Sequence, residues 1–270
     1  MDEQSYFLNI ASYKLLAKKE VGQNFLIEPR IAEKIVSKLD LQPDDYGLEI
    51  GCGTGALTFF LAKSEAKVDA IDIDEAMLAK TGNDFANHST LTVKYGNACD
   101  YDYTPYTKIV GNLPYYITSL ILEKVLLGAV KATRLVFMVQ KEAGERILAK
   151  PSDKDYGPLN ILLDLLYRGE RAFNVSRNCF APAPHVDSQV YVLSRKADMA
   201  IETAAKVYDL AKKLFLLRRK TIYNNLKHVL GDATKAEAVL AKAGLAPTLR
   251  PENLTPEQYL HLTRIVMGEE

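Results

Sequence analysis

Residues 47–55 read GLEIGCGTG, a short apolar run that passes into three alternating glycines. Glycine lets a backbone turn sharply and approach a ligand closely, as it does between the first strand and the first helix of a nucleotide-binding sheet. Asp72 ends the next apolar run, where an acid can hydrogen-bond both hydroxyls of a ribose. The pattern therefore predicts a site for a nucleoside-containing cofactor. We assign to it Glu49, Gly51, Gly53, Gly55 and Asp72.

The loop also indicates which cofactor is bound. Its spacing differs from the Gly-x-Gly-x-x-Gly of dinucleotide sites, and it lacks the Gly-Lys-Ser/Thr ending of a phosphate-binding loop. Glu49 would repel a pyrophosphate, whereas the ammonium and sulfonium groups of S-adenosylmethionine tolerate nearby carboxylates. The residues thus favour S-adenosylmethionine over NAD. Asn97, after the third apolar run, can meet the adenine amine, although Asn is equally suited to a simple turn.

The arrangement of apolar runs predicts the fold class. Runs at 47–51, 67–72, 91–95, 108–111 and 134–139 alternate with helical patterns, as in a parallel sheet covered by helices. Two later runs with no helix between them, 171–175 and 189–195, predict an antiparallel edge. Helix formers at 3.6-residue periodicity follow. We expect an α/β, Rossmann-like methyltransferase domain over 1–196, with an N-terminal extension over 1–22, and a small all-α domain over 197–270.

A candidate catalytic motif, Asn112-Leu113-Pro114-Tyr115, follows the fourth run, where open α/β sheets bind ligands. The Asn112 oxygen and a nearby backbone carbonyl can accept both N–H bonds of an exocyclic amine and aim its lone pair at a methyl group. Pro114 stiffens that backbone, and Tyr115 offers an aromatic face to a base. Orientation of the amine toward the methyl group would accelerate the transfer, so no strong general base is required. A plain β-turn is the alternative interpretation.

Phe180 lies on a loop that contains two prolines. An aromatic ring on a stiff loop could stack on the second face of a target base, although a core-facing Phe is commoner in general.

Charge is balanced overall but not locally. Lysine plus arginine and aspartate plus glutamate both number 34, which excludes a uniformly basic nucleic-acid binder. Between residues 206 and 227, however, seven basic residues accompany one acid. Three adjacent cations repel one another unless an anion lies nearby, so this segment predicts nucleic-acid contact, with a solvated helix face as the alternative. The assigned residues are Lys212, Lys213, Arg218, Arg219 and Lys220.

Several classes of protein are not expected. Three separated cysteines and four scattered histidines predict neither a disulfide framework nor a metal site. No apolar run approaches the roughly 20 residues of a membrane helix, and the N-terminus has no signal pattern. We therefore expect a cytoplasmic, monomeric protein that binds no membrane and no metal.

From about residue 22 to about residue 226 the chain resembles the small-subunit (16S) ribosomal RNA adenine N6-dimethyltransferases, also called dimethyladenosine transferases. The matching segments are 22–26 (GQNFL), 49–58, 112–119 (NLPYYITS), 138–142 (MVQKE), 180–188 (FAPAPHVDS) and 218–226 (RRKTIYNNL). The resemblance implies S-adenosylmethionine as methyl donor. It also implies dimethylation of two adjacent adenosines in the 3′-terminal hairpin loop of small-subunit rRNA, within a pre-ribosomal particle.

The same resemblance implies roles for individual residues. Asn24 and Leu26 would join Gly51, Asp72, Asn97 and Asn112 at the cofactor, while Tyr115 and Phe180 would sandwich the target base.

Five positions depart from the family pattern. Cys52 replaces Pro, Asp72 replaces Glu, Asn97 replaces Asp, Leu120 replaces Pro and His185 replaces Lys. Asn97 can still accept a hydrogen bond, so we expect weaker cofactor binding rather than its loss.

Three rival functions differ at recognisable residues. The sister family that methylates large-subunit rRNA and confers macrolide resistance usually has Ile in place of Leu113, and the basic motif at 218–221 also favours the small subunit. A non-catalytic ribosome assembly factor would not need the intact motif at 112–115. DNA adenine methyltransferases typically carry Pro-Pro-Tyr after their Asp or Asn, against which Leu113 argues.

Overall fold

The computed structural model describes residues 2–16, 23–114 and 116–269. The chain divides into two compact units. The first comprises Met1–Gly144 and Gly169–Arg195, and the second comprises Glu145–Arg168 and Lys196–Glu270.

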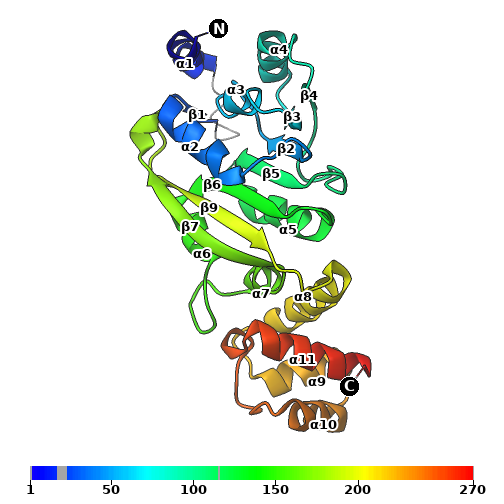
Figure 1. Cartoon of the computed structure of the whole chain (residues 1–270). Helices are drawn as coiled ribbons and strands as arrows, with labels where there is room; N and C mark the ends of the chain where they lie inside the picture. The colour runs from blue at the N-terminus through cyan, green and yellow to red at the C-terminus, as the bar shows by residue number, and fades with distance from the viewer. Residues whose placement is uncertain (1, 17–22, 115, 270) are drawn as a thin grey trace. The chain divides into compact units, whose positions relative to one another are not determined.

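A seven-stranded sheet in the order β4-β3-β2-β5-β6-β9-β7 forms the first unit's centre (Figure 1). The strands are β2 (Tyr46–Ile50), β3 (Lys67–Asp72), β4 (Leu91–Tyr95), β5 (Lys108–Asn112), β6 (Arg134–Gln140), β7 (Tyr167–Val175) and β9 (Ser188–Arg195). Neighbours from β4 to β6 pair in parallel, and β9 pairs antiparallel with β6. The predicted α/β class and the antiparallel strand are therefore confirmed.

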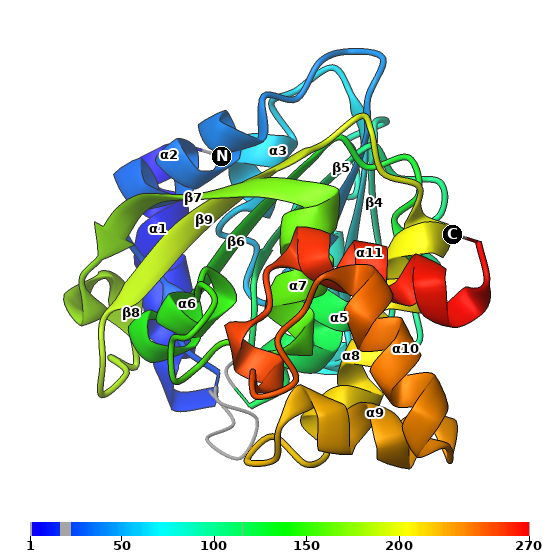
Figure 2. The ribbon, with the colours of Figure 1, turned by 90° about the horizontal axis from the view of Figure 1, so that it is seen from below.

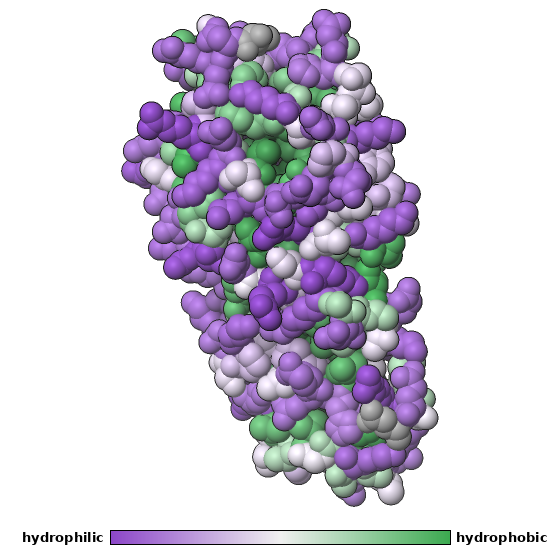
Figure 3. All heavy atoms as spheres, viewed as in Figure 1, coloured by the Kyte–Doolittle hydropathy of each residue, from purple (hydrophilic) through white to green (hydrophobic). Residues whose placement is uncertain are grey.

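Helices cover both faces of this sheet because most side chains of its central strands are apolar and buried. The helices of the first unit are α1 (Glu3–Ser12), α2 (Pro29–Leu39), α3 (Thr58–Leu61), α4 (Glu75–Asp84) and α5 (Thr118–Gly128). Helix α6 (Lys141–Ile147) begins in the first unit and ends in the second. Helices α2 and α3 lie on one face and α5 on the other (Figures 1 and 2). Hydrophilic side chains predominate on the face seen in Figure 3, as expected when the apolar residues are inside.

A small two-stranded sheet was not predicted. Strand β1 (Phe25–Leu26) pairs antiparallel with β8 (Phe180–Ala181), so two predicted site segments far apart in the sequence are hydrogen-bonded neighbours. Short 3-10 turns complete the described elements. They are η1 (Tyr13–Leu16), η3 (Arg177–Cys179) and η4 (Pro251–Asn253).

The second unit is helical. Its helices are α7 (Pro158–Leu166), α8 (Ile201–Phe215), α9 (Ile222–Leu230), α10 (Ala233–Ala243) and α11 (Pro256–Met267). Side chains of Thr221, Asp232 and Thr255 accept backbone N–H bonds at the starts of α9, α10 and α11.

The second unit also takes in 145–168, which the predicted boundary at residue 196 assigns to the first domain. Helix α7 explains the difference. It is apolar and largely buried, and it packs against α8 and α11, so its partners lie later in the chain.

Across the described residues, no helix combines the length and apolar character needed to cross a membrane. The same part of the chain holds no cluster of three or more His, Cys, Asp or Glu side chains placed to bind a metal ion.

Candidate cofactor and catalytic site

A pocket lies at the carboxyl ends of β2, β3 and β5 in the first unit. Strand β2 sits between β3 and β5, so the order of the strands reverses here, and open α/β sheets bind ligands at such a point. The pocket is lined by the segment around β1, the glycine loop, the end of β3, the turn after β4 and the motif after β5. Five segments distant in sequence thus meet at one site.

Two glycines of the loop have a left-handed backbone conformation, as expected for a sharp turn between a strand and a helix. Gly51 and Gly53 have φ of +72° and +49°, in the left-handed region that favours glycine, and both line the pocket. The N–H groups of Gly51 and Cys52 donate to the Ile71 carbonyl at 2.8 and 3.0 Å. The loop is therefore tied to the end of β3.

Gly55 does not line the pocket, contrary to its predicted place in the cofactor site. Its φ is +88°, and a Cβ at this position would lie 2.4 Å from the Tyr6 hydroxyl and 3.3 Å from Phe85. Packing behind the loop, rather than a ligand in front of it, requires glycine here.

Asp72 is held by backbone N–H groups at the rim of the pocket. Its Oδ2 accepts from Gly53 at 2.8 Å and its Oδ1 accepts from Asp74 at 2.9 Å. Burial raises the pKa of Asp72, and these hydrogen bonds only partly oppose the shift. The carboxyl is thus fixed in orientation beside the loop.

Glu49, at the end of β2, is 1% exposed and accepts a 2.6 Å hydrogen bond from the Thr58 hydroxyl. Burial raises the pKa of Glu49 to about 8; the nearby Asp72 charge adds to the shift and the Thr58 bond opposes it. No lysine or arginine is among the described residues that line the pocket. Two carboxyls without a cationic partner favour a positively charged ligand.

Asn97 lines the pocket, but its amide already has partners. Its Oδ1 accepts from the Cys99 N–H at 3.0 Å, and its Nδ2 donates to Asp100 at 3.2 Å. An aspartate would present a second oxygen, whereas Asn97 offers a ligand amine only the remaining lone pair of Oδ1.

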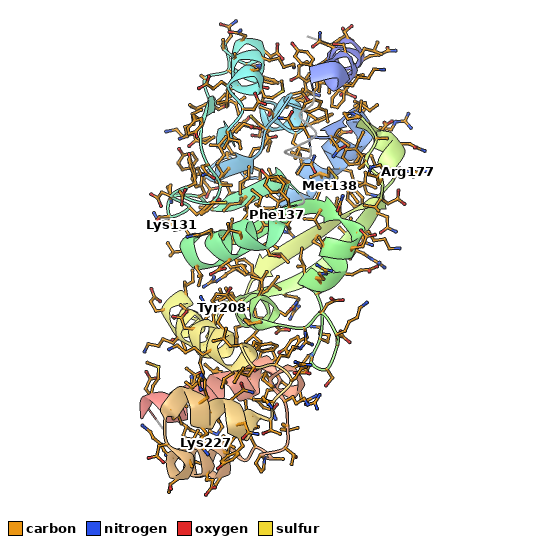
Figure 4. The ribbon with its side chains drawn as sticks, turned by 180° about the vertical axis from the view of Figure 1, so that it is seen from behind. Lys131, Phe137, Met138, Arg177, Tyr208 and Lys227 are labelled. Atoms are coloured by element: carbon orange, nitrogen blue, oxygen red, sulfur yellow. The ribbon has the colours of Figure 1, made fainter. Side chains whose placement is uncertain are left out.

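The predicted catalytic motif begins on the last residue of β5. Asn112, Leu113 and Pro114 line the pocket. The Leu113 N–H donates at 3.0 Å to the carbonyl of Met138, which is labelled on β6 in Figure 4. The Pro114 carbonyl accepts from the Ile117 N–H at 3.3 Å and from the Thr118 hydroxyl at 3.0 Å. The backbone of the motif is therefore fixed on both sides. Tyr115 lies outside the described residues.

Phe180 is not brought to the pocket. It is 3% exposed and belongs to the hydrophobic core, which is the alternative that the sequence left open. Its strand partner, Leu26, does line the pocket, as does Asn24. The predicted stacking of Phe180 on a base stays a prediction.

The predicted basic residues lie together in the second unit, at the end of α8 and in the turn after it. Lys213, Arg219 and Lys220 are exposed. Lys212 pairs with Asp209 at 3.3 Å. Arg218 is half-buried, with Nε 3.7 Å from a Glu252 carboxylate oxygen and a terminal nitrogen donating to the Asp153 carbonyl at 3.3 Å.

A buried amide shapes this turn. The Asn225 side chain is 1% exposed, and its Nδ2 lies 3.0–3.2 Å from the carbonyls of Leu217, Lys220 and Thr221. The backbone that carries Arg218, Arg219 and Lys220 is thereby held in one conformation.

Comparison with known proteins gives the family. A model of the ribosomal RNA adenine dimethylase family matches residues 14–267. The chain belongs to this family. Membership confirms the resemblance noted in the sequence and the predicted class of enzyme, an rRNA adenine dimethyltransferase.

Individual relatives of this dimethylase family cover almost the whole chain. Ribosomal RNA small subunit methyltransferase A of Malacoplasma penetrans is 35% identical over 266 residues, 97% of this chain and 96% of the relative. A solved dimethyladenosine transferase from Plasmodium falciparum has a TM-score of 0.76 at 27% identity and covers 90% of this chain and 96% of its own. The solved 23S rRNA methyltransferase ErmE has a TM-score of 0.66 at 26% identity, with coverage of 89% and 98%.

Sequence reasoning missed several residues of this dimethylase's site. Ile73, Ile117 and Ile121 give the pocket its apolar wall. Ile117 and Ile121 follow the catalytic motif four residues apart, and this helical spacing was a usable signal. Tyr6 and Lys80, which contact the back of the glycine loop, had no local signal at all.

We predict that Glu49→Gln stabilises the cofactor-free protein increasingly as pH rises. The folded-state pKa of Glu49, about 8, lies above its ordinary 4.5, so the folded state holds the proton more tightly. The contribution of this bound proton to the wild-type free energy of unfolding is fully present below about pH 4.5. It is lost as the pH rises to about 8. Glutamine carries no charge at any of these pH values. The Tm difference between variant and wild type should therefore grow across this window.

Thermal unfolding at several pH values across that window measures the effect. Glu65→Gln, at an exposed position of the same unit, is the control and should show no such trend. A Tm difference for Glu49→Gln that stayed constant with pH would contradict the role given to this buried carboxyl.

Proposed function

We propose that this chain transfers methyl groups from S-adenosylmethionine to N6 of two adjacent adenosines in the 3′-terminal hairpin loop of 16S rRNA. The observation that carries the proposal is the meeting, in one pocket, of the Asn112-Leu113-Pro114 backbone with the buried Glu49 carboxyl and the half-buried Asp72 carboxyl. Family membership and the small-subunit name of the Malacoplasma penetrans relative support the choice of rRNA substrate. We expect the reaction to occur in the cytoplasm on a pre-ribosomal particle, with the enzyme acting as a monomer.

The lining residues fit S-adenosylmethionine. We assign the ribose hydroxyls to Asp72, whose two oxygens are already oriented by backbone N–H groups. Glu49 supplies negative charge for the ammonium or sulfonium group, and Ile73 supplies an apolar surface for the adenine. Gly51 and Gly53 leave room for close approach of the ligand to the backbone. Asn24, Leu26 and Asn97 complete the assigned set.

The chain's own groups would orient the target amine. Bound S-adenosylmethionine supplies an electrophilic methyl group on its sulfonium. The Asn112 oxygen accepts one N6–H bond, and we assign the second to the Leu113 carbonyl, because the Pro114 carbonyl already accepts two bonds from the start of α5. Two acceptors on one side turn the nitrogen lone pair toward the methyl group. Attack of N6 on the methyl carbon would form the N–C bond while the bond from that carbon to sulfur breaks, and the N6 proton would leave to solvent.

We assign rRNA contact to the helical unit. Lys213, Arg219 and Lys220 are exposed cations on or beside a preformed turn, and such residues contact phosphates rather than base edges. The target adenosine must leave its stack to reach a pocket, and a hairpin loop lowers that cost.

A methyl-transfer assay tests the function directly. Labelled S-adenosylmethionine is offered with unmethylated small subunits and, separately, with unmethylated large subunits, and the nucleosides are analysed. We expect dimethyladenosine on the small subunit alone. Label on the large subunit would assign the chain to the resistance-type enzymes. Bound cofactor with no label on either would indicate a non-catalytic assembly factor.

In the same assay, we predict that Asn112→Ala lowers transfer by at least about a hundredfold, because one of two amine acceptors is lost at the reacting nitrogen. Cofactor binding, measured by calorimetry, should persist in part. Asn87→Ala, at an exposed turn outside the pocket, is the matched control and should keep wild-type activity. Full activity in Asn112→Ala would refute the assigned amine acceptors.

We also predict that cofactor binding strengthens between about pH 6 and about pH 7.5, where an ordinary α-amino group remains largely protonated. A cationic ligand favours the ionised form of Glu49, so binding releases a proton from a carboxyl with a pKa of about 8. The Kd should fall by up to about tenfold for each pH unit. Glu49→Gln should bind more weakly and without this pH dependence. The same pH slope in both proteins would exclude Glu49 as the group that is titrated.

The basic turn makes a separate prediction about salt. Arg219→Ala should weaken binding to unmethylated small subunits and lower the slope of log K against log salt by about one, as expected for one lost phosphate contact. Arg218→Ala should weaken binding and lower the slope less than Arg219→Ala, and it should also lower Tm, because Arg218 contacts Glu252 and Asp153. Lys242→Ala, an exposed cation on α10, is the control. Equal salt slopes for Arg219→Ala and Lys242→Ala would remove the turn from the RNA-binding surface.

A further inference from the structure

The back of the glycine loop is held by the first helix of the chain. Tyr6 of α1 is 1% exposed, and its hydroxyl donates to the carbonyls of Thr54 and Gly55 at 3.0 and 3.3 Å. Its ring stacks on Phe59 with centroids 4.8 Å apart. A residue of the N-terminal extension therefore contacts the cofactor loop directly.

A buried lysine from α4 reaches the same point. The Lys80 ammonium donates to the Thr54 carbonyl at 2.8 Å and to Asp84 at 2.5 Å, and it lies 4.5 Å from the centroid of the Tyr6 ring. Lys80 is 9% exposed. The next residue of α4 is Thr81, and its hydroxyl donates to the Gly53 carbonyl at 2.8 Å. The carbonyls of residues 53, 54 and 55 thus all have side-chain donors behind the loop.

The third glycine belongs to this arrangement. Because a Cβ at Gly55 would lie 2.4 Å from the Tyr6 hydroxyl, any other residue there would displace Tyr6 or the loop. Gly55, which the loop pattern assigned to the ligand, instead leaves room for the Tyr6 hydroxyl.

We propose that Tyr6 and Lys80 are positioning residues for the cofactor, so that helix α1 is a working part of the cofactor site. Both fix the Thr54 carbonyl. The neighbouring Gly53 N–H in turn donates to Asp72 Oδ2 at 2.8 Å, the carboxyl assigned to the ribose. Loss of either donor loosens the loop and the orientation of Asp72 with it. The inference rests on the proposed function in that the ligand is S-adenosylmethionine.

The test compares Tyr6→Phe with Phe7→Leu. Tyr6→Phe keeps the ring on Phe59 and removes only the hydroxyl. Phe7, on the same helix, packs edge-on against Phe59 without a hydrogen bond to the loop, so Phe7→Leu reports loss of packing alone. We expect Tyr6→Phe to raise the Kd for S-adenosylmethionine about three- to tenfold, as for one lost hydrogen bond, with kcat at saturating cofactor unchanged. Phe7→Leu should lower Tm and leave Kd unchanged.

The double variant with Lys80→Met adds a second readout. Because both donors hold one carbonyl, the Kd changes of Tyr6→Phe and Lys80→Met should be non-additive. A wild-type Kd in Tyr6→Phe would overturn the inference. So would a rise in Kd that followed the loss of Tm equally in Tyr6→Phe and Phe7→Leu, since that result indicates a merely structural role.

Hydrogen exchange separates this inference from the proposed function. If wild-type protein bound no S-adenosylmethionine, the proposed function would fail, and amide exchange of residues 51–55 in the ligand-free protein would decide the positioning role. Faster exchange in Tyr6→Phe, with wild-type exchange in Phe7→Leu, supports it, and unchanged exchange in Tyr6→Phe overturns it.

Discussion

Strands β2 and β5 pair in parallel with Ile50 opposite Gly111, and this register holds the two halves of the site together. A Cβ at Gly111 would lie 2.8 Å from the Ile50 carbonyl, so glycine allows the strand ends to close up. The glycine loop leaves β2 at this level, and Asn112 ends β5 beside it. A larger residue at 111 would push β5 away from β2. The glycine loop and Asn112, which line the same pocket, would then separate.

The negative charge of a buried carboxyl lowers the stability of the ligand-free fold but favours the binding of a cation. A carboxyl buried without a cation raises its own pKa and weakens the fold at any pH where it must ionise. Glu49 meets this condition, and its hydrogen bonding to Thr58 only partly offsets burial. A cationic ligand removes the conflict because it supplies the missing charge. An amide at the same position would suit the ligand-free protein better, so folding does not explain the acid, whereas the proposed binding of a cation does.

Local motifs revealed much of the site, and long-range contacts explain what they missed. Asp72 and Asn112 were predictable because each follows its own strand, and parallel strands present their carboxyl ends together. Gly55 was assigned to the ligand because the loop pattern alone does not show what packs behind it. The contact that requires glycine there comes from Tyr6, 49 residues earlier. The predicted boundary at residue 196 differs from the division seen in the structure because the apolar pattern of helix α7 does not show which elements it packs against. Its partners, α8 and α11, come after the last strand.

Adjacent residues of one type can carry different roles, as the basic turn illustrates. Arg218 contacts Glu252 and the Asp153 carbonyl, so part of its charge is used within the unit, whereas Arg219 is exposed. Three successive cations would repel one another and spread the turn if its backbone were free. Asn225 opposes this because its amide lies within hydrogen-bond distance of three of the turn's carbonyls. A turn already ordered before binding loses less entropy when an RNA phosphate arrives, so under the proposed function the buried asparagine would contribute to affinity without touching the RNA.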